Sequence, residues 1–156
     1  MREIRFARGV VEQLWQHATV RIGNPSRRVA ILFFDLLCPF CKKEVAEIDP
    51  LLGAAERGLI GFALYDLVVH DEAKPHHLNI RCLPEERRLE AIRSFYSGVV
   101  YTMLGCNAQL PPLEPLARLG IFATPTTLVY NMEKDVGRIF AGYTPVDKVI
   151  EALLKI

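Results

Sequence analysis

The sequence has little that would take the chain into a membrane or onto nucleic acid. Residues 1–17 lack the long uncharged apolar core of a signal peptide, and the longest apolar runs, 29–37 and 59–70, are too short or too interrupted to span a bilayer. The net charge is only +1, so no electrostatic argument favours nucleic acid or anionic lipid as a partner. We expect a cytoplasmic protein without a membrane partner, or a periplasmic or extracytoplasmic one if the chain is a trimmed mature form.

Low-complexity tracts and internal repeats are also absent, and 51% of the 156 residues are hydrophobic. A chain of this length and composition can bury a sizeable core and is typical of one globular domain. We therefore expect residues 1–156 to form a single domain that acts as a monomer or a small homo-oligomer.

Hydrophobic patterns predict an alternation of strands and helices. The continuous apolar runs at 29–35 and 59–69 are typical of strands buried on both faces, and the helix between them, 39–57, should bend or break at Pro50. Two parallel strands joined through a helix form a right-handed crossover. Two further elements are predicted before this unit, a helix at 6–17 and a short strand at 18–22.

The middle of the chain has a different, mostly helical pattern. The polar stretch 70–77 predicts a loop or a short helical turn. A helix that starts at Pro84 carries apolar residues at helical spacing as far as Met103. A short helix at 111–119 should follow and end at Gly120.

The C-terminal part predicts a β-hairpin and a final helix. Strands at 126–130 and 137–143 are joined by a turn. The helix has Thr144 as its N-cap, Pro145 as its first residue and Asp147 at the acidic position of a capping box. Together these elements predict an α/β fold in which helices flank both faces of a mixed central sheet.

Cysteine is scarce, since the chain has only Cys38, Cys41, Cys82 and Cys106. In a reducing cytosol a close pair of cysteines usually serves catalysis or metal binding, although intracellular proteins of hyperthermophiles do carry structural disulfides. The pair in CPFC follows the predicted strand 29–35 and opens the next helix. The sulfur of Cys38 would thus face the free N–H groups of that helix, which stabilise a thiolate.

The two cysteines of CPFC are therefore expected to have different roles. A thiolate at Cys38 is the species that attacks a disulfide. Cys41 lies about one helical turn further on the same side, where it is shielded and can resolve a mixed disulfide. Between them, Pro39 stiffens the turn and Phe40 adds neither charge nor donor, so both residues tune the stability of the reduced form.

Two other uses of the pair stay open at this point. The pair could supply half of a zinc site, which needs about four ligands and would have to recruit His70, His76 or His77. The strong zinc pattern is two such cysteine pairs, whereas Cys82 and Cys106 stand alone. The pair could also form a merely structural disulfide.

CPFC after the strand ending in FFD resembles the active-site region of the thioredoxin superfamily, and within it the DsbA/DsbC/DsbG thiol:disulfide oxidoreductases. The stretch FATPTTLVY, 122–130, is similar to the loop that carries the cis-proline of that superfamily. A helical insertion, at about 70–120, separates these two landmarks as it does in that group. The resemblance covers roughly residues 18–156 and implies a thioredoxin-like fold.

The resemblance also implies an activity and a site. Pro125, preceded by Thr124, would lie beside Cys38 in a cis peptide bond, and the backbone of Thr124 would pair with an extended substrate segment as an added strand does. Pro39 and Phe40 would also contact the substrate. The implied activity is disulfide exchange with protein thiols and disulfides, including those of a redox partner, without a bound cofactor and without a metal. The direction of electron flow stays open.

A second cysteine pair at similar spacing forms a structural disulfide in the insertion of the DsbC-like branch. The resemblance thus implies a disulfide between Cys82 and Cys106, which flank the helix that starts at Pro84. Two free buried thiols, or a redox or metal role, are the alternatives for this pair.

The chain departs from the family pattern at several places. Leu37 replaces the tryptophan that precedes the first active-site cysteine of thioredoxin. Leu32 occupies the position of a buried acid, so proton handling by that acid is expected to be absent. The nearby Asp35 is interpreted as a solvated or capping residue, with a catalytic group as the alternative. Only about 28 residues precede the core strand, too few for the N-terminal dimerisation domain of DsbC-like isomerases.

Two functions besides direct exchange with proteins therefore stay open. One is a glutaredoxin-like reductase that uses glutathione. The other is a non-catalytic module of thioredoxin fold, which would bind a metal or a partner protein through the same thiols.

Overall fold

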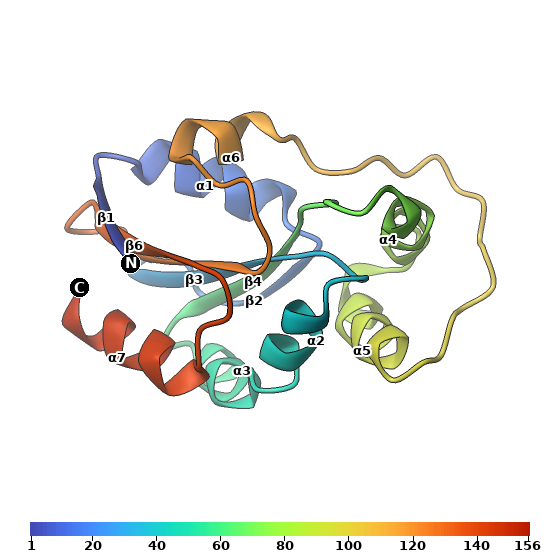
Figure 1. The fold of residues 1–156 in the computed structure, drawn as a ribbon. Coiled ribbons are helices and arrows are strands. Elements are labelled where there is room, and N and C mark those ends of the chain that lie inside the picture. Colours follow the sequence, from blue (N-terminus) through green and yellow to red (C-terminus); the bar gives the residue numbers. More distant parts are fainter.

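A six-stranded sheet runs through the protein, whose computed structural model describes residues 1–156 (Figure 1). The two strands of the predicted crossover, β3 (Arg28–Phe34) and β4 (Gly61–Asp66), pair in parallel, and every other pair of neighbouring strands is antiparallel. The predicted mixed central sheet is therefore confirmed. The strand order is β1-β6-β5-β3-β4-β2, where β1 is Arg2–Arg5, β2 is Val20–Gly23, β5 is Thr126–Asn131 and β6 is Val136–Ala141.

Helices cover both faces of the sheet, because alternate side chains of β3 point to opposite sides. Leu32 and Phe34 belong to one buried cluster, and Ile31 and Phe33 belong to another on the opposite face. A strand buried on both faces needs apolar residues at every position, which explains the continuous run in the sequence. The first cluster is covered by α2 (Pro39–Val45), α3 (Asp49–Glu56) and α7 (Val146–Lys155), and the second by α1 (Arg8–His17) and α6 (Glu114–Leu119) (Figure 1).

The predicted helix 39–57 is divided where Pro50 lies, as expected. The first half, α2, ends at Val45, and α3 starts at Asp49 with Pro50 in its first turn. A proline in that position has no helical hydrogen bond to lose, because the first N–H groups of a helix have no partner within it. None of the helices combines the length and the apolar surface that a bilayer-spanning segment requires.

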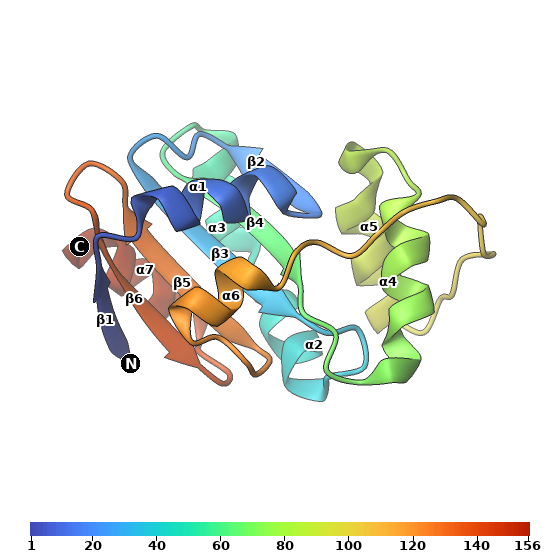
Figure 2. The same cartoon turned by 90° about the horizontal axis from the view of Figure 1, so that it is seen from above.

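The predicted helical insertion lies between β4 and β5, and its helices α4 and α5 form one end of the molecule (Figure 2). A short 3-10 turn, Asp71–Ala73, leads into α4 (Lys74–Arg81), which lies beside α5 (Glu85–Tyr96). A segment without helix or strand, residues 97–113, then runs around these two helices to α6 (Figures 1 and 2). We call this segment the strap.

Two details of the insertion differ from the sequence-based prediction. Part of the stretch predicted as a loop or short turn, residues 74–77, begins the full helix α4. The next helix, α5, ends at Tyr96 and does not continue to Met103, because Gly98 adopts a left-handed backbone with φ 92°. Met103 lies in the strap and is 49% exposed, so the apolar spacing beyond Tyr96 is not that of a helix face.

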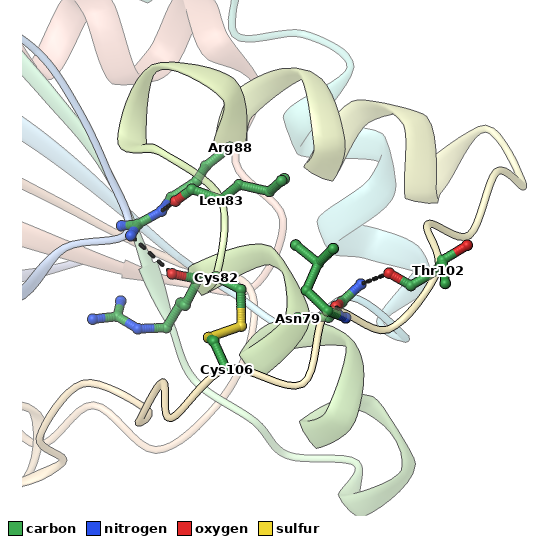
Figure 3. Close-up of a disulfide and its surroundings, with 8 residues drawn as sticks. Asn79, Cys82, Leu83, Arg88, Thr102 and Cys106 are labelled. Atoms are coloured by element: carbon green, nitrogen blue, oxygen red, sulfur yellow. Dashed lines mark hydrogen bonds between the residues drawn. A yellow bond between two sulfur atoms is a disulfide. The ribbon is translucent and has the colours of Figure 1, made fainter.

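A disulfide between Cys82 and Cys106 fastens the strap to the end of α4 (Figure 3). The Cα atoms of the two cysteines are 5.8 Å apart. Next to the disulfide, the Asn79 side-chain N–H donates to the carbonyl of Thr102 at 3.3 Å, and its Oδ1 accepts from the Leu104 N–H at 2.7 Å. The implied disulfide is confirmed, and the alternative of two free thiols is wrong.

The first residues of the chain extend the sheet before the first helix begins. The predicted helix 6–17 starts at Arg8, because Phe6 has a left-handed backbone with φ 58° and the Ala7 N–H donates to the Tyr130 hydroxyl at 2.8 Å. The preceding four residues form β1, which pairs with β6 at the edge of the sheet. This strand is mostly charged and exposed, so apolar periodicity does not reveal it.

The final helix begins with Pro145 as its N-cap, so the predicted capping box of Thr144 and Asp147 is wrong. The Thr144 hydroxyl donates to the Gly142 carbonyl at 3.2 Å instead. The Thr144 N–H donates to the carboxylate of Glu44 on α2 at 2.9 Å. A tertiary contact with α2 therefore replaces the local cap.

Removing the disulfide should destabilise the fold without changing the chemistry of CPFC. The disulfide joins residues 24 positions apart, and closing a loop of that size stabilises the folded state by about 3 kcal/mol in the chain-entropy model. We expect the double variant Cys82→Ala/Cys106→Ala to melt roughly 5–10 °C lower in a thermal unfolding experiment, with wild-type reactivity at Cys38. An unchanged melting temperature would contradict this structural role.

Candidate active site

Cys38 lies between the end of β3 and the start of α2. Its backbone is extended, with φ −85° and ψ 118°, and it is the N-cap of α2. Its sulfur accepts a hydrogen bond from the Cys41 N–H at 3.3 Å, and its carbonyl accepts one from the Lys42 N–H at 3.1 Å. The sulfur thus occupies the position of an N-capping oxygen, where the free N–H groups and the helix dipole stabilise negative charge.

Cys41 lies one turn further along α2 and is shielded from solvent. It is fully buried, whereas Cys38 retains 7% exposure. Burial raises the pKa of the Cys41 thiol, so this group holds its proton more tightly than an exposed cysteine does. Both thiols are free and largely buried, but they are unequal, and Cys38 is the more exposed one.

The loop before β5 lies against Cys38. The peptide bond between Thr124 and Pro125 is cis, and the Cys38 S–H donates to the Thr124 carbonyl with an S···O distance of 3.6 Å. The Pro125 carbonyl accepts from the Gly142 N–H at 2.8 Å, which ties this loop to the turn after β6. Two motifs 86 positions apart in the chain therefore meet at one sulfur atom.

Exposed apolar side chains accompany both motifs. On the CPFC side, Phe40 is 62% exposed and Leu37 is 40% exposed, while Phe122, shortly before Thr124, is 73% exposed. Pro39 lies in the first turn of α2 and is also exposed. Exposed apolar surface of this kind is typical of sites that contact other molecules.

Asp35 anchors the turn between β3 and α2. It is fully buried, and its carboxylate accepts hydrogen bonds from the N–H groups of Leu37 at 2.8 Å, Val69 at 2.7 Å and His70 at 2.7 Å. Burial alone would raise the pKa of Asp35, but these hydrogen bonds outweigh it and lower the pKa below its usual value. Asp35 is therefore neither solvated nor the cap of a helix, since the N-cap of α2 is Cys38. Its carboxylate instead binds backbone N–H groups of the turn and of the segment after β4.

Glu44 supplies a buried carboxyl that the sequence analysis missed. It follows Cys41 by three positions and accepts hydrogen bonds from the Thr127 hydroxyl at 2.6 Å and from the Thr144 N–H at 2.9 Å. Glu44 lines a small cavity together with Leu32, the residue that replaces the buried acid of the family pattern. Burial raises the pKa of Glu44. The leucine therefore does not leave this region without a carboxyl, because the helix supplies one.

The candidate zinc ligands have other partners. The Nδ1 atom of His70 is 3.0 Å from the Asp35 carboxylate, and His76 packs against an aromatic ring of α5. The Nδ1 atom of His77 is hydrogen-bonded to the Asp66 carboxylate at 2.7 Å. No group of three or more His, Cys, Asp or Glu side chains is arranged to hold a metal ion.

Comparisons with known proteins agree with this arrangement at the level of the fold. No protein-family model matches the chain, and no curated protein matches it either. Solved structures match over most of its length, although the sequence identities are low. One is a disulfide interchange protein from Neisseria gonorrhoeae, with 19% identity, a TM-score of 0.62, and coverage of 90% of this chain and 96% of that chain. Another is DsbA2 from Pseudomonas aeruginosa, with 16% identity, a TM-score of 0.64, and coverage of 87% of this chain and 92% of that chain. A third is BdbD from Bacillus subtilis, with 14% identity, a TM-score of 0.66, and coverage of 90% of this chain and 92% of that chain.

The chain therefore has a thioredoxin-like fold of the DsbA type. The matches extend over 87–90% of this chain, too much for them to leave out the insertion between β4 and β5. The resemblance inferred from CPFC and from the loop at Pro125 is confirmed for the fold.

The unequal environments of the two thiols predict selective alkylation. In the reduced protein at about pH 8, iodoacetamide should modify Cys38 at least about 100-fold faster than Cys41, because burial and a raised pKa leave little reactive thiolate at Cys41. Tandem mass spectrometry of the tryptic peptide that holds both cysteines measures the two rates. In urea-denatured protein, the control, the rates should converge. Equal rates in the native protein would show that the assigned asymmetry is wrong.

The raised pKa of Glu44 predicts the sign of a pH-dependent stability. A carboxyl with a raised folded-state pKa binds its proton more tightly when folded, so its contribution is fully present at low pH and is lost as the pH rises through the folded pKa. Relative to Glu44→Gln, which stays neutral, the wild type should lose free energy of unfolding as the pH rises above about 4, the ordinary pKa of a glutamate. Urea denaturation of both proteins measures the difference. If the wild type instead gained free energy of unfolding relative to Glu44→Gln as the pH rises, the assigned direction of the pKa shift would be wrong.

Proposed function

We propose that the protein is a thiol:disulfide oxidoreductase that exchanges disulfides with protein substrates. The observation that carries the proposal is the set of contacts at the Cys38 sulfur, which accepts the Cys41 N–H at 3.3 Å and lies 3.6 Å from the Thr124 carbonyl. A nucleophile, a second thiol and a substrate-facing backbone are thus within reach of one another. The name of one similar structure, a disulfide interchange protein, supports the same chemistry.

In the reducing direction, the Cys38 thiolate attacks one sulfur of a substrate disulfide. A bond forms between Cys38 and that sulfur, the substrate disulfide breaks, and the other substrate sulfur leaves as a thiolate that takes up a proton. Cys41 then loses its proton and attacks the Cys38 sulfur, which releases the second substrate thiol and leaves a Cys38–Cys41 disulfide. Two electrons pass from the pair to the substrate. The oxidising direction is the same sequence in reverse.

The order of attack follows from the two environments. Cys38 caps α2 and keeps some exposure, so its thiolate is both stabilised and reachable. Cys41 is buried and has a raised pKa, so it is a poor partner for a protein in solution. Once a substrate is attached to Cys38, however, Cys41 is one helical turn from the sulfur that it has to attack.

The substrate that fits this site is an extended polypeptide segment. The backbone of Thr124 lies beside Cys38 and would pair with such a segment as a neighbouring strand does. Phe40 and Pro39 on one side, and Phe122 on the other, would contact apolar residues around the substrate cysteine. The thiols carry the electrons themselves, so the proposal includes no bound cofactor. The direction of flow depends on the potential of the pair relative to that of its redox partner.

Serine substitutions at the two cysteines should have different effects. With a disulfide-bonded peptide as substrate, Cys38→Ser should lower the exchange rate by at least about 100-fold, because the attacking thiolate is lost. Cys41→Ser should instead accumulate a mixed disulfide between Cys38 and the peptide, since no thiol remains to resolve it. Both outcomes are measured by liquid chromatography and mass spectrometry.

The Cys82→Ala/Cys106→Ala variant is the matched control, because it removes two cysteines outside the site and should exchange at the wild-type rate. Undiminished exchange in Cys38→Ser would refute the proposal. If exchange by the wild type required glutathione, and its rate reached a plateau as the glutathione concentration rose, the result would instead favour a glutaredoxin-like reductase.

A further inference from the structure

A buried histidine in the insertion is hydrogen-bonded to the backbone of the turn that carries Cys38. His77 lies on α4 and is fully buried. Its Nε2 atom accepts a hydrogen bond from the backbone N–H of Leu36 at 3.0 Å. Leu36 precedes Cys38 by two positions, in the turn between β3 and α2. An imidazole nitrogen that accepts a hydrogen bond bears no proton, so His77 is neutral with its proton on Nδ1.

The other side of the ring fixes the same tautomer. The Nδ1–H of His77 donates to Oδ2 of Asp66 at 2.7 Å, and Asp66 is itself buried at the end of β4. The second oxygen of Asp66 accepts from the Thr19 hydroxyl, which accepts in turn from Arg81 at 2.5 Å. The guanidinium of Arg81 also lies 3.7 Å from Asp66 and balances its charge. Asp66 is therefore held as a carboxylate acceptor for His77.

The position of the ring is set by packing as well. The imidazole of His77 lies against the ring of Phe34, with 5.1 Å between the centroids and 34° between the planes. Phe34 is the last residue of β3. His77 thus packs against the end of β3 and also binds the turn that follows β3. These two contacts together restrict the position of the Leu36 N–H.

Among the backbone N–H groups of residues 36–38, only that of Leu36 has an acceptor from outside the turn. The Leu37 N–H is bound by the Asp35 carboxylate at 2.8 Å, and the Cys38 N–H by the Asp35 carbonyl at 3.1 Å. These two hydrogen bonds shape the turn locally. The bond from Leu36 to His77 is the one that fixes the turn to α4, 41 positions along the chain.

We propose that His77 is a positioning residue for Cys38, and this inference rests on the function proposed above. As a neutral acceptor, it holds the turn so that the Cys38 sulfur stays at the N-terminus of α2 and beside the Thr124 carbonyl. It touches neither the sulfur nor the substrate. The helical insertion therefore sets the reactivity of the thiol through one backbone hydrogen bond.

The test compares His77→Phe with His77→Gln. Phenylalanine keeps the aromatic contact with Phe34 but offers no acceptor to Leu36. Glutamine has both an acceptor for Leu36 and a donor for Asp66. The matched control is His76→Phe, which changes the neighbouring residue on α4 without touching the turn. The rate of Cys38 alkylation is measured for each reduced protein, together with its thermal stability and its exchange activity.

We expect His77→Phe to slow Cys38 alkylation by about tenfold and His77→Gln to stay within about threefold of the wild type, because only the first leaves Leu36 without a partner. His76→Phe should react like the wild type. A wild-type alkylation rate in His77→Phe, with only a lower melting temperature, would reduce His77 to a structural role and overturn the inference. Equal slowing in His77→Phe and His77→Gln would overturn it as well.

A spectroscopic measurement on the wild type keeps the inference testable if His77→Phe does not fold. In a ¹H–¹⁵N spectrum of the imidazole, His77 should show a protonated Nδ1 and an unprotonated Nε2. The opposite tautomer, or a doubly protonated ring, would overturn the inference. Wild-type protein that shows no exchange with peptide disulfides would count against the proposed function alone, because alkylation and the imidazole spectrum still report on the position of Cys38.

Discussion

The hydrogen bond from the Cys41 N–H to the Cys38 sulfur is the interaction on which the rest of the site depends. It exists because β3 ends and α2 begins within four residues, so that a cysteine serves as the cap of a helix. A cap of this kind favours negative charge on the sulfur, while the buried position of Cys41 disfavours charge on the second thiol. One short turn thus creates the difference between two chemically identical groups.

Hydrogen bonds from buried polar side chains hold that turn in place. Asp35 binds three backbone N–H groups, and its own carbonyl accepts from the hydroxyl of Tyr96 on α5 at 2.8 Å. His77 binds the turn from α4. Two helices of the insertion, α4 and α5, therefore contact the turn. The insertion, which contains no residue of the CPFC motif, belongs to the machinery that fixes the geometry of this motif.

Local patterns in the sequence predict most of the elements and the centre of the site. The run before CPFC predicts a strand, Pro39 marks a helix start, Pro50 marks a break in that helix, and the later Thr124–Pro125 pair completes the resemblance. These features predict well because each depends on neighbours in the chain. The contact between Cys38 and the loop of Thr124 and Pro125 follows from the family likeness and not from the residues alone.

The remaining features depend on tertiary contacts, and the sequence carries only faint signals for them. Glu44 stands on the apolar stripe of α2 between Cys41 and Val45, and a charged residue in such a stripe is the one hint that its carboxyl is buried. His77 resembles its exposed neighbours in a polar stretch, so nothing local distinguishes it. The cap predicted at Thr144 fails because Glu44, 100 positions earlier, takes its N–H.

The reduction potential of the CPFC pair tests the central claim most directly. The protein is equilibrated with glutathione buffers of graded composition, quenched with acid, and analysed by mass spectrometry for the Cys38–Cys41 disulfide. The account predicts one reversible two-electron transition, with a midpoint between about −270 and about −120 mV, the range of known thiol:disulfide exchange proteins. Absence of a Cys38–Cys41 disulfide throughout this range, or a stable glutathione adduct on Cys38 in its place, would contradict it.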